Sequence, residues 1–157
     1  MVNKFIPHLL VLCEDQATHD IAVGFNDMVT GEMEVRKPLR GWPHVLQEFK
    51  DVYIPWLRAH QNCHLALFID FDNTFATRLK LFQGDIPQDV ADRVFVFGAL
   101  DEAESVKKES GLKLSNIGMH LADECIQNSS ILWGSNQVRH NEPERQRLHA
   151  KCGAFLL

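Results

Sequence analysis

Short apolar runs alternate along this chain with longer stretches in which apolar residues recur every three or four positions. Residues 8–13, 65–69 and 94–97 are almost wholly apolar, which is typical of strands covered on both faces. Residues 33–37 alternate between apolar and polar side chains, as a half-exposed strand does. The pattern therefore predicts these four strands and, in addition, a short edge strand at 131–133.

Helical spacing fills the segments between and after the strands. The predicted helices are 16–28, 42–60, 74–82, 87–91, 101–110, 115–127 and 141–153. Pro55 predicts a kink in the second helix, because proline has no backbone N–H to donate. Two helix starts show the spacing of a capping pair, Asp101 with Glu104 and Asn141 with Glu144. Strands that alternate with helices predict a single compact α/β domain, with a largely parallel central sheet of about four strands flanked by helices.

The composition agrees with one globular domain. The 157 residues are 45% hydrophobic and 24% charged, which is enough for a core without disulfide or metal support. No apolar run approaches the roughly 20 residues of a membrane helix, and the first residues do not resemble a signal peptide, so we expect a cytoplasmic protein that contacts no membrane. The cysteines show no Cys-x-x-Cys spacing, and Cys13 and Cys63 are expected to be reduced core residues.

The net charge of −5 argues against a surface that binds nucleic acid by itself, because phosphate binding relies on many Lys and Arg side chains. Three local basic clusters could contact phosphates or simply form a salt-bridged surface. They are Arg36, Lys37 and Arg40; Arg78 and Lys80; and Arg139, Arg145, Arg147 and Lys151. A bound divalent cation would reverse the negative sign locally.

Acidic residues stand at the ends of three predicted strands. Glu14 follows the first strand, and Asp70 and Asp72 follow the run at 65–69. A third acidic group follows the strand at 94–97, and it consists of Asp101, Glu102 and Glu104. Open α/β sheets bind ligands at the carboxyl ends of their strands, so we expect Asp70 and Asp72 to bind a hard divalent cation such as Mg²⁺ or Mn²⁺.

Each of these groups also has a structural interpretation. The aspartate pair can serve as turn and helix-capping residues. The acidic group at 101–104 either contributes to a second metal or caps the following helix. Arg78 and Arg93 are candidate phosphate contacts near the same strand ends, with ion pairing to the acids as the alternative.

A glutamate after a first strand, followed by helix, strand, helix and an Asp-x-Asp pair after an apolar strand, resembles the Toprim domain of topoisomerases, primases and OLD-family nucleases. The resemblance covers about residues 5–110. It implies a single Toprim-like domain in which residues 111–157 form a C-terminal helical extension. It implies that Glu14 is the general acid or base and a metal ligand, and that Asp70 and Asp72 bind magnesium. It also implies a nuclease or nuclease subunit that acts on nucleic acid, with DNA favoured over RNA, beside an ATPase partner in a defence or repair complex.

The chain departs from the Toprim pattern at two places. Asp15 stands where the family usually has glycine after the glutamate, and Asn73 and Thr74 stand where the family has a third aspartate after the pair.

The segment from Phe68 to Thr74 also resembles the first motif of haloacid dehalogenase-type phosphatases. In such an enzyme Asp70 would be the nucleophile and Asp72 would protonate the leaving group. That motif ordinarily opens its fold, whereas here two strands and two helices precede it. No apolar strand that ends in Ser or Thr lies between the motif and Val94.

A third hypothesis is a non-catalytic Toprim-like interaction module. Aromatic and polar residues on the second helix and near the C-terminus could form a protein interface. They are Phe49, Tyr53, Trp56, Trp133, His140 and Asn141. For Phe49 and Tyr53 we expect a place in the core instead.

Overall fold

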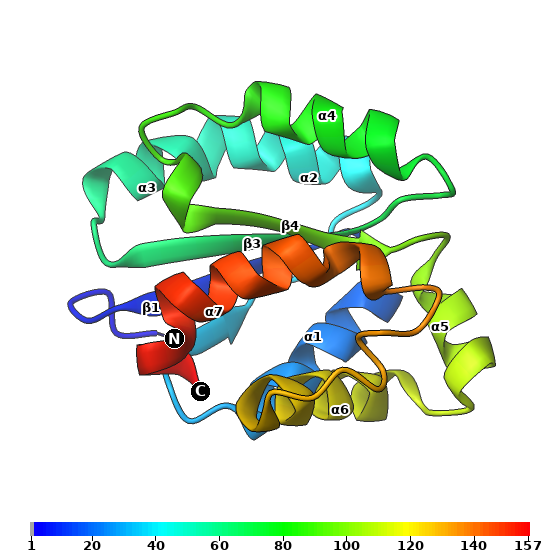
Figure 1. Ribbon diagram of the computed structural model, residues 1–157. Coiled ribbons are helices and arrows are strands. Elements are labelled where there is room, and N and C mark those ends of the chain that lie inside the picture. The colour runs from blue at the N-terminus through cyan, green and yellow to red at the C-terminus, as the bar shows by residue number, and fades with distance from the viewer. Residues whose placement is uncertain (1) are drawn as a thin grey trace.

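A four-stranded parallel sheet runs through the middle of the molecule (Figure 1). The computed structural model describes residues 2–157. Its strands are β1 (His8–Cys13), β2 (Met33–Val35), β3 (Cys63–Asp70) and β4 (Val94–Ala99). Their order is β2-β1-β3-β4, and every adjacent pair is parallel. The carboxyl ends of the two central strands, β1 and β3, therefore lie next to each other.

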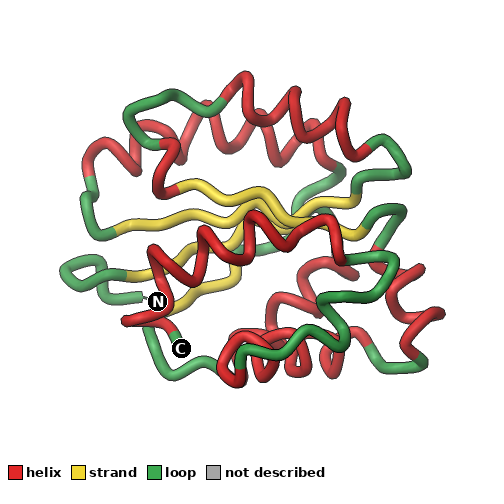
Figure 2. The backbone as a smooth tube through the Cα atoms, viewed as in Figure 1, coloured by secondary structure: helices red, strands yellow, loops and turns green. Residues whose placement is uncertain are grey.

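Helices cover both faces of this sheet, as the tube in Figure 2 also shows. One face carries α2 (Trp42–Glu48), α3 (Ile54–Ala59) and α4 (Phe75–Asp85), and the other carries α1 (Gln16–Met28), α5 (Ala103–Ser110), α6 (Leu114–Gln127) and α7 (Glu142–Leu156). Successive residues of a strand point to opposite faces, so each central strand supplies two cores. Leu10 and Leu12 belong to the core under α2, whereas Leu9 and Val11 belong to the core under α1 and α6.

The predicted fold class is confirmed, since the chain forms a single compact α/β domain with a parallel four-stranded sheet and flanking helices. β1 has the predicted bounds, and β3 begins two residues before the predicted run. β2 ends at Val35, earlier than predicted. Even so, the N–H of Arg36 donates to the carbonyl of Val11 at 2.9 Å, so the chain stays attached to β1 beyond the strand.

The predicted helix at 42–60 is interrupted near its proline. α2 and α3 are joined by a π-helical segment, Phe49–Tyr53, after which the N–H of Ile54 donates to the carbonyl of Phe49. Pro55 follows directly and has no N–H to donate. The irregularity expected at this proline is thus a π-helical turn immediately before it.

Two predicted elements are wrong. Residues 131–133 form a turn and not an edge strand, because the buried carboxylate of Glu124 accepts the N–H groups of the last two of these residues. Residues 87–90 form a turn where a short helix was expected, and a 3-10 helix, Ala91–Arg93, follows them.

The predicted capping pairs are also wrong. Glu102 rather than Asp101 precedes α5, and its side chain makes no capping hydrogen bond. Asn141 precedes α7 without capping it, because its side chain bonds the backbone of β4 instead. The sequence analysis missed the capping box at α1, in which Asp15 and Thr18 each accept the other's backbone N–H.

Residues after 110 pack into the same domain. α6 lies against α1 so closely that a Cβ atom at Gly24 would fall 1.9 Å from the carbonyl oxygen of Ser115. A Cβ atom at Gly118 would fall 1.8 Å from the carbonyl oxygen of Ile21. α7 adds buried residues to the same core. These helices therefore complete one face of the sheet.

Candidate functional site

Glu14 and Asp70 lie beside each other at the carboxyl ends of β1 and β3. The N–H of Glu14 donates to the carbonyl of Phe68 at 3.0 Å, which continues the strand pairing beyond β1. The Glu14 carboxylate then accepts the N–H of Asp70 at 2.6 Å. Both residues are buried, with exposed fractions of 9% and 6%. The sheet itself therefore fixes the distance between these two acids.

Burial and mutual repulsion oppose ionisation of both carboxyls. Burial, followed by the charges of Asp15 and Glu14, raises the pKa of Asp70 to about 8. The N–H of Ala103 donates to Asp70 Oδ1 at 3.0 Å and only partly offsets this rise. Burial also raises the pKa of Glu14, and the charges of Asp15 and Asp72 add to the increase. At neutral pH the pair therefore favours a bound proton or a neighbouring cation.

Asp72 lies in a tight turn between β3 and α4. Asp72 and Asn73 have φ values of 47° and 58°, in the left-handed region that residues other than glycine rarely adopt. Two backbone hydrogen bonds hold the turn to the residues that follow β4. The N–H of Asp72 donates to the backbone carbonyl of Asp101, and the N–H of Asn73 donates to the backbone carbonyl of Leu100, both at 2.8 Å. The Asp72 side chain is 51% exposed and pairs with Arg78 at 2.5 Å.

Arg78 links the aspartates to an aromatic ring. Its Nη1 also donates to the carbonyl of Asp70 at 2.9 Å, and its guanidinium carbon lies 4.6 Å from the centre of the Trp42 ring. The backbone N–H of Trp42 lies near the Glu14 carboxylate and partly offsets the rise of its pKa, and the N–H of Gly41 donates to the Glu14 carbonyl at 3.1 Å. The sequence analysis missed Trp42 and Gly41 as parts of this site. The available signal was a glycine directly before a helix.

The acidic group after β4 has a structural role. Asn73 donates to one carboxylate oxygen of Asp101 at 3.0 Å, and Ser105 donates to the other at 2.9 Å. Glu102 occupies the N-cap position of α5, and Glu104 lies in its first turn, where a negative charge is favourable. These contacts favour the helix-start interpretation over a second metal.

Within residues 2–157, no three His, Cys, Asp or Glu side chains converge as a group that could hold a metal ion. At the acidic edge, the carboxylate of Asp72 is bound by Arg78 instead. In donor chemistry the residues fit a hard divalent cation: Glu14, Asp70 and Asp72 offer only oxygen, and two of them are buried and repel each other.

Arg93 does not lie near these acids, so its expected phosphate contact is wrong. It precedes β4, at the opposite end of the strand, and is 8% exposed. Its guanidinium donates to the carbonyls of Leu57, His60 and Cys63 at 2.9–3.0 Å. Arg93 therefore joins α3 to β3 from inside the protein.

The residues suggested for an interaction surface are mostly buried. Phe49 and Tyr53 lie in the core, as predicted, with exposed fractions of 0% and 6%. Trp133 and Asn141 are also buried, whereas Trp56 is 37% exposed. Trp56 is therefore the aromatic side chain of this set that is open to a partner.

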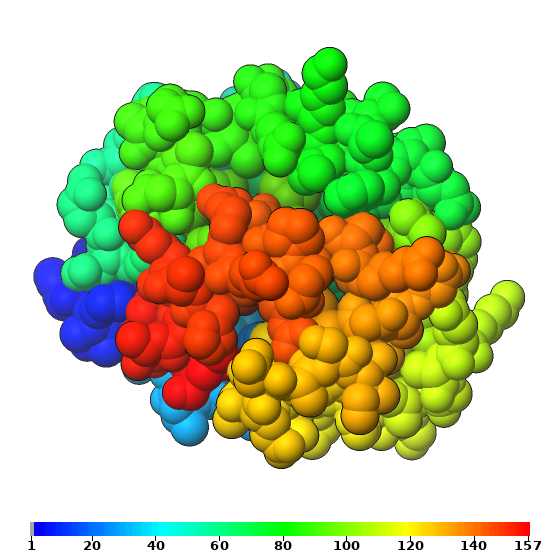
Figure 3. Space-filling model, viewed as in Figure 1, coloured from blue at the N-terminus to red at the C-terminus, as the bar shows by residue number. Residues whose placement is uncertain are grey.

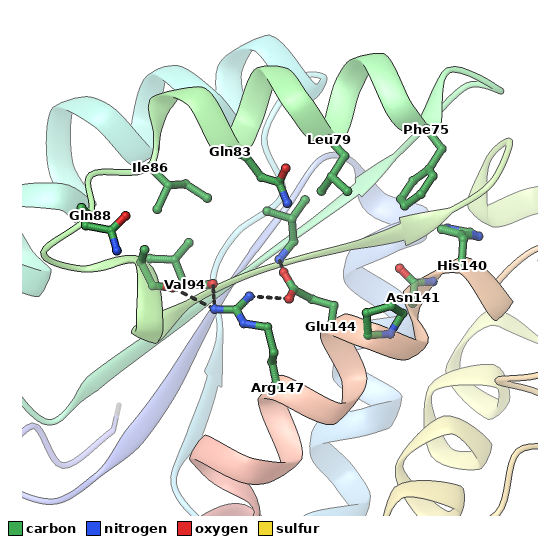
Figure 4. A pocket seen from close by; sticks show the side chains of 13 residues that line it. Phe75, Leu79, Gln83, Ile86, Gln88, Val94, His140, Asn141, Glu144 and Arg147 are labelled. Atoms are coloured by element: carbon green, nitrogen blue, oxygen red, sulfur yellow. Dashed lines mark hydrogen bonds and ion pairs between the residues drawn. The ribbon is translucent and has the colours of Figure 1, made fainter.

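A cavity of about 410 Å³ opens between α4 and α7, away from the acidic pair (Figures 3 and 4). Figure 3 shows the surface hollowed between the green residues of α4 and the red and orange residues of α7. Its lining includes Leu79, Ile86 and Val94, and an ion pair between Glu144 and Arg147 lies at its α7 side.

Side chains from the start of α7 and from the residue before it also occupy the free edge of β4. Glu144 accepts the N–H of Val96 at 2.8 Å. Asn141 accepts the N–H of Gly98 at 3.1 Å and donates to its carbonyl at 2.9 Å. Helical side chains thereby satisfy strand groups that would otherwise need a fifth strand.

Comparison of the chain with protein-family models, with curated proteins and with solved structures finds no match. Among the described residues, no helix combines the length and the apolar character needed to cross a membrane.

Proposed function

We propose that this protein is a magnesium-dependent hydrolase of nucleic-acid phosphodiester bonds, similar to the Toprim nucleases. The observation that supports the proposal is the hydrogen bond between the Glu14 carboxylate and the N–H of Asp70. It joins a glutamate at the end of β1 to an Asp-x-Asp pair at the end of the adjacent strand, the arrangement that the Toprim resemblance implies.

Glu14, Asp70 and Asp72 are the proposed ligands of Mg²⁺ or Mn²⁺. When bound, the ion would act as a Lewis acid that polarises the phosphodiester and stabilises the charge on the departing oxygen. The protein holds Glu14 and Asp70 in place through the β1–β3 pairing. The half-exposed Asp72 can approach them by rotation of its side chain.

Glu14 is the proposed general acid or base. The N–H of Asp70 holds its carboxyl at the edge of the sheet, where it can exchange a proton with a reacting oxygen. Arg78 is the proposed phosphate contact, because its forked guanidinium matches the geometry of phosphate oxygens. Arg93 has no part in this proposal.

The proposed substrate is nucleic acid, with DNA favoured over RNA, and the proposed setting is a cytoplasmic defence or repair complex with an ATPase partner. These points rest on the Toprim resemblance. The acidic chain agrees with the need for a cation and a partner, since it carries a net charge of −5.

The test is an assay of nuclease activity and of para-nitrophenyl phosphate hydrolysis, each with Mg²⁺ or Mn²⁺. The variants are Glu14→Ala and Asp72→Ala, and Glu104→Ala serves as the control because it removes an acid on the same side of the sheet. We expect DNA nicking by the wild type and by the control. In both site variants the rate of DNA nicking should fall at least about a hundredfold, which is the usual scale for the loss of a catalytic acid or base.

Two other outcomes would replace this proposal. Phosphatase turnover that survives Glu14→Ala would favour the haloacid dehalogenase-type mechanism with Asp70 as nucleophile. The burial of Asp70 and its bond to Ala103 speak against that role. No activity on either substrate, together with a stably copurifying protein, would favour the interaction module.

A further inference from the structure

Arg78 forms two contacts that compete with the proposed cation. Its Nη1 binds Asp72 at 2.5 Å and the carbonyl of Asp70 at 2.9 Å. The Arg78 side chain is 14% exposed and packs over the Trp42 ring, so these contacts hold the guanidinium in place. A positive charge therefore already lies beside one of the proposed metal ligands.

The turn leaves the side chain of Asp72 as the part that can move. The backbone of Asp72 and Asn73 is tied to the end of β4 by hydrogen bonds of 2.8 Å, and Asn73 is tied further through the side chain of Asp101. The Asp72 carboxylate has Arg78 as its hydrogen-bond partner within the described residues and is 51% exposed. Rotation of this side chain can therefore exchange Arg78 for a cation without any change in the backbone.

We infer that Arg78 is a positioning residue that keeps Asp72 away from the cation until a phosphate group of the substrate binds the guanidinium. This inference rests on the proposed function. A phosphate offers two oxygens to the guanidinium fork, so it competes well with the single oxygen of Asp72. Once Asp72 is released from Arg78, it joins Glu14 and Asp70 as the third proposed ligand of the cation. Phosphate and divalent cation therefore bind cooperatively, each raising the affinity for the other by the same factor.

Mn²⁺ binding, followed by the electron paramagnetic resonance of the free ion, tests the inference without any catalytic readout. Wild type is compared with Arg78→Gln, which removes the charge and keeps a polar side chain. Lys80→Gln is the matched control, since Lys80 is an exposed cation on the same helix. With the metal alone, Arg78→Gln should bind Mn²⁺ about threefold to fivefold more tightly than wild type, the scale of a partly exposed ion pair. Lys80→Gln should bind like wild type.

The second arm adds a thymidine dinucleotide joined by a phosphorothioate, a linkage that resists cleavage. The dinucleotide should raise the Mn²⁺ affinity of wild type and of Lys80→Gln, and it should leave that of Arg78→Gln unchanged. The gain from Arg78→Gln should also disappear in an Asp72→Asn background, because the effect passes through Asp72.

The failures of the two proposals are distinguishable. Equal Mn²⁺ affinities of wild type and Arg78→Gln, or the same gain in Lys80→Gln, would overturn the role of Arg78 and leave the metal site intact. Lack of Mn²⁺ binding by both wild type and Arg78→Gln would overturn the inference and the proposed metal site together.

Discussion

At the scale of single residues, Asp70 is the most strongly perturbed of the proposed ligands. Its folded-state pKa of about 8 lies above the ordinary value of 3.8, so the folded protein holds the Asp70 proton more tightly than the unfolded chain does. The contribution of this group to stability is therefore fully present below the ordinary pKa and is lost as the pH rises toward 8.

Replacement of Asp70 by Asn should remove this pH dependence. The quantity to compare is the free energy of unfolding of Asp70→Asn minus that of wild type, measured in EDTA. This difference should increase between about pH 4 and pH 8 by up to roughly 5 kcal/mol. Urea unfolding at several pH values measures this difference, with the exposed Asp27→Asn as the control. A constant difference between Asp70→Asn and wild type across this range would contradict the raised pKa.

The sequence identified the acids of the site but not their partners. Glu14, Asp70 and Asp72 could be found because each follows an apolar strand, and strand ends in a parallel sheet converge. The contact between Arg78 and Trp42 could not be found, since it joins residues 36 positions apart through side-chain packing. Arg93 was misplaced because a charge beside a strand shows neither which end of the sheet it occupies nor whether it is buried.

At the scale of elements, the parallel strands and most helices could be predicted from periodicity alone. The failures occurred where a side chain replaces a backbone partner. Glu124 binds the segment predicted as an edge strand, and Asn141 bonds β4 instead of capping α7. Such bonds join residues distant in sequence and leave no periodic signal.

The contact between α1 and α6 at Gly118 should not tolerate a methyl group. Gly118→Ala places a Cβ atom 1.8 Å from the carbonyl oxygen of Ile21, so α1 and α6 must separate at a cost of roughly 3 kcal/mol or more. Gly84→Ala on α4 is the matched control, because no atom lies within 4 Å of its added Cβ. That control should gain about 0.5–1 kcal/mol from helix propensity. Chemical denaturation measures both, and similar stabilities of the two variants would contradict this close packing.

The edge of β4 depends on a side chain that the sequence suggested as a helix cap. Asn141→Ala leaves the N–H of Gly98 without this partner and removes one donor from its carbonyl, which keeps His140 Nε2 at 2.6 Å, and burial makes the loss costly. We expect a loss of about 2–4 kcal/mol in the free energy of unfolding. The exposed Asn136→Ala is the control and should lie within about 0.5 kcal/mol of wild type. Equal losses in the two variants would show that the bond to Gly98 adds little.

At the scale of the whole molecule, charge is unevenly distributed along the carboxyl edge of the sheet. Arg36, Lys37 and Arg40 follow β2, whereas acids follow β1, β3 and β4. In the basic cluster near the C-terminus, Arg145 binds backbone carbonyls, and Lys151 pairs with Asp92 at 2.8 Å. Three of the four strand ends therefore carry acids that repel a phosphate backbone, and part of the C-terminal basic cluster is occupied by structural contacts.

This distribution predicts that nucleic-acid binding requires a divalent cation. Anisotropy of a labelled single-stranded 20-residue DNA should show little binding in EDTA and clear binding with Mg²⁺, because the ion reverses the sign of the acidic edge. Asp70→Asn should lose most of this Mg²⁺-dependent gain, whereas Asp27→Asn should keep it. The proposed phosphate contacts are the ion and Arg78, so few phosphates are neutralised and the affinity should also fall only weakly with added salt. Equal binding in EDTA and in Mg²⁺, or a steep salt dependence, would instead indicate a basic surface that acts without the metal.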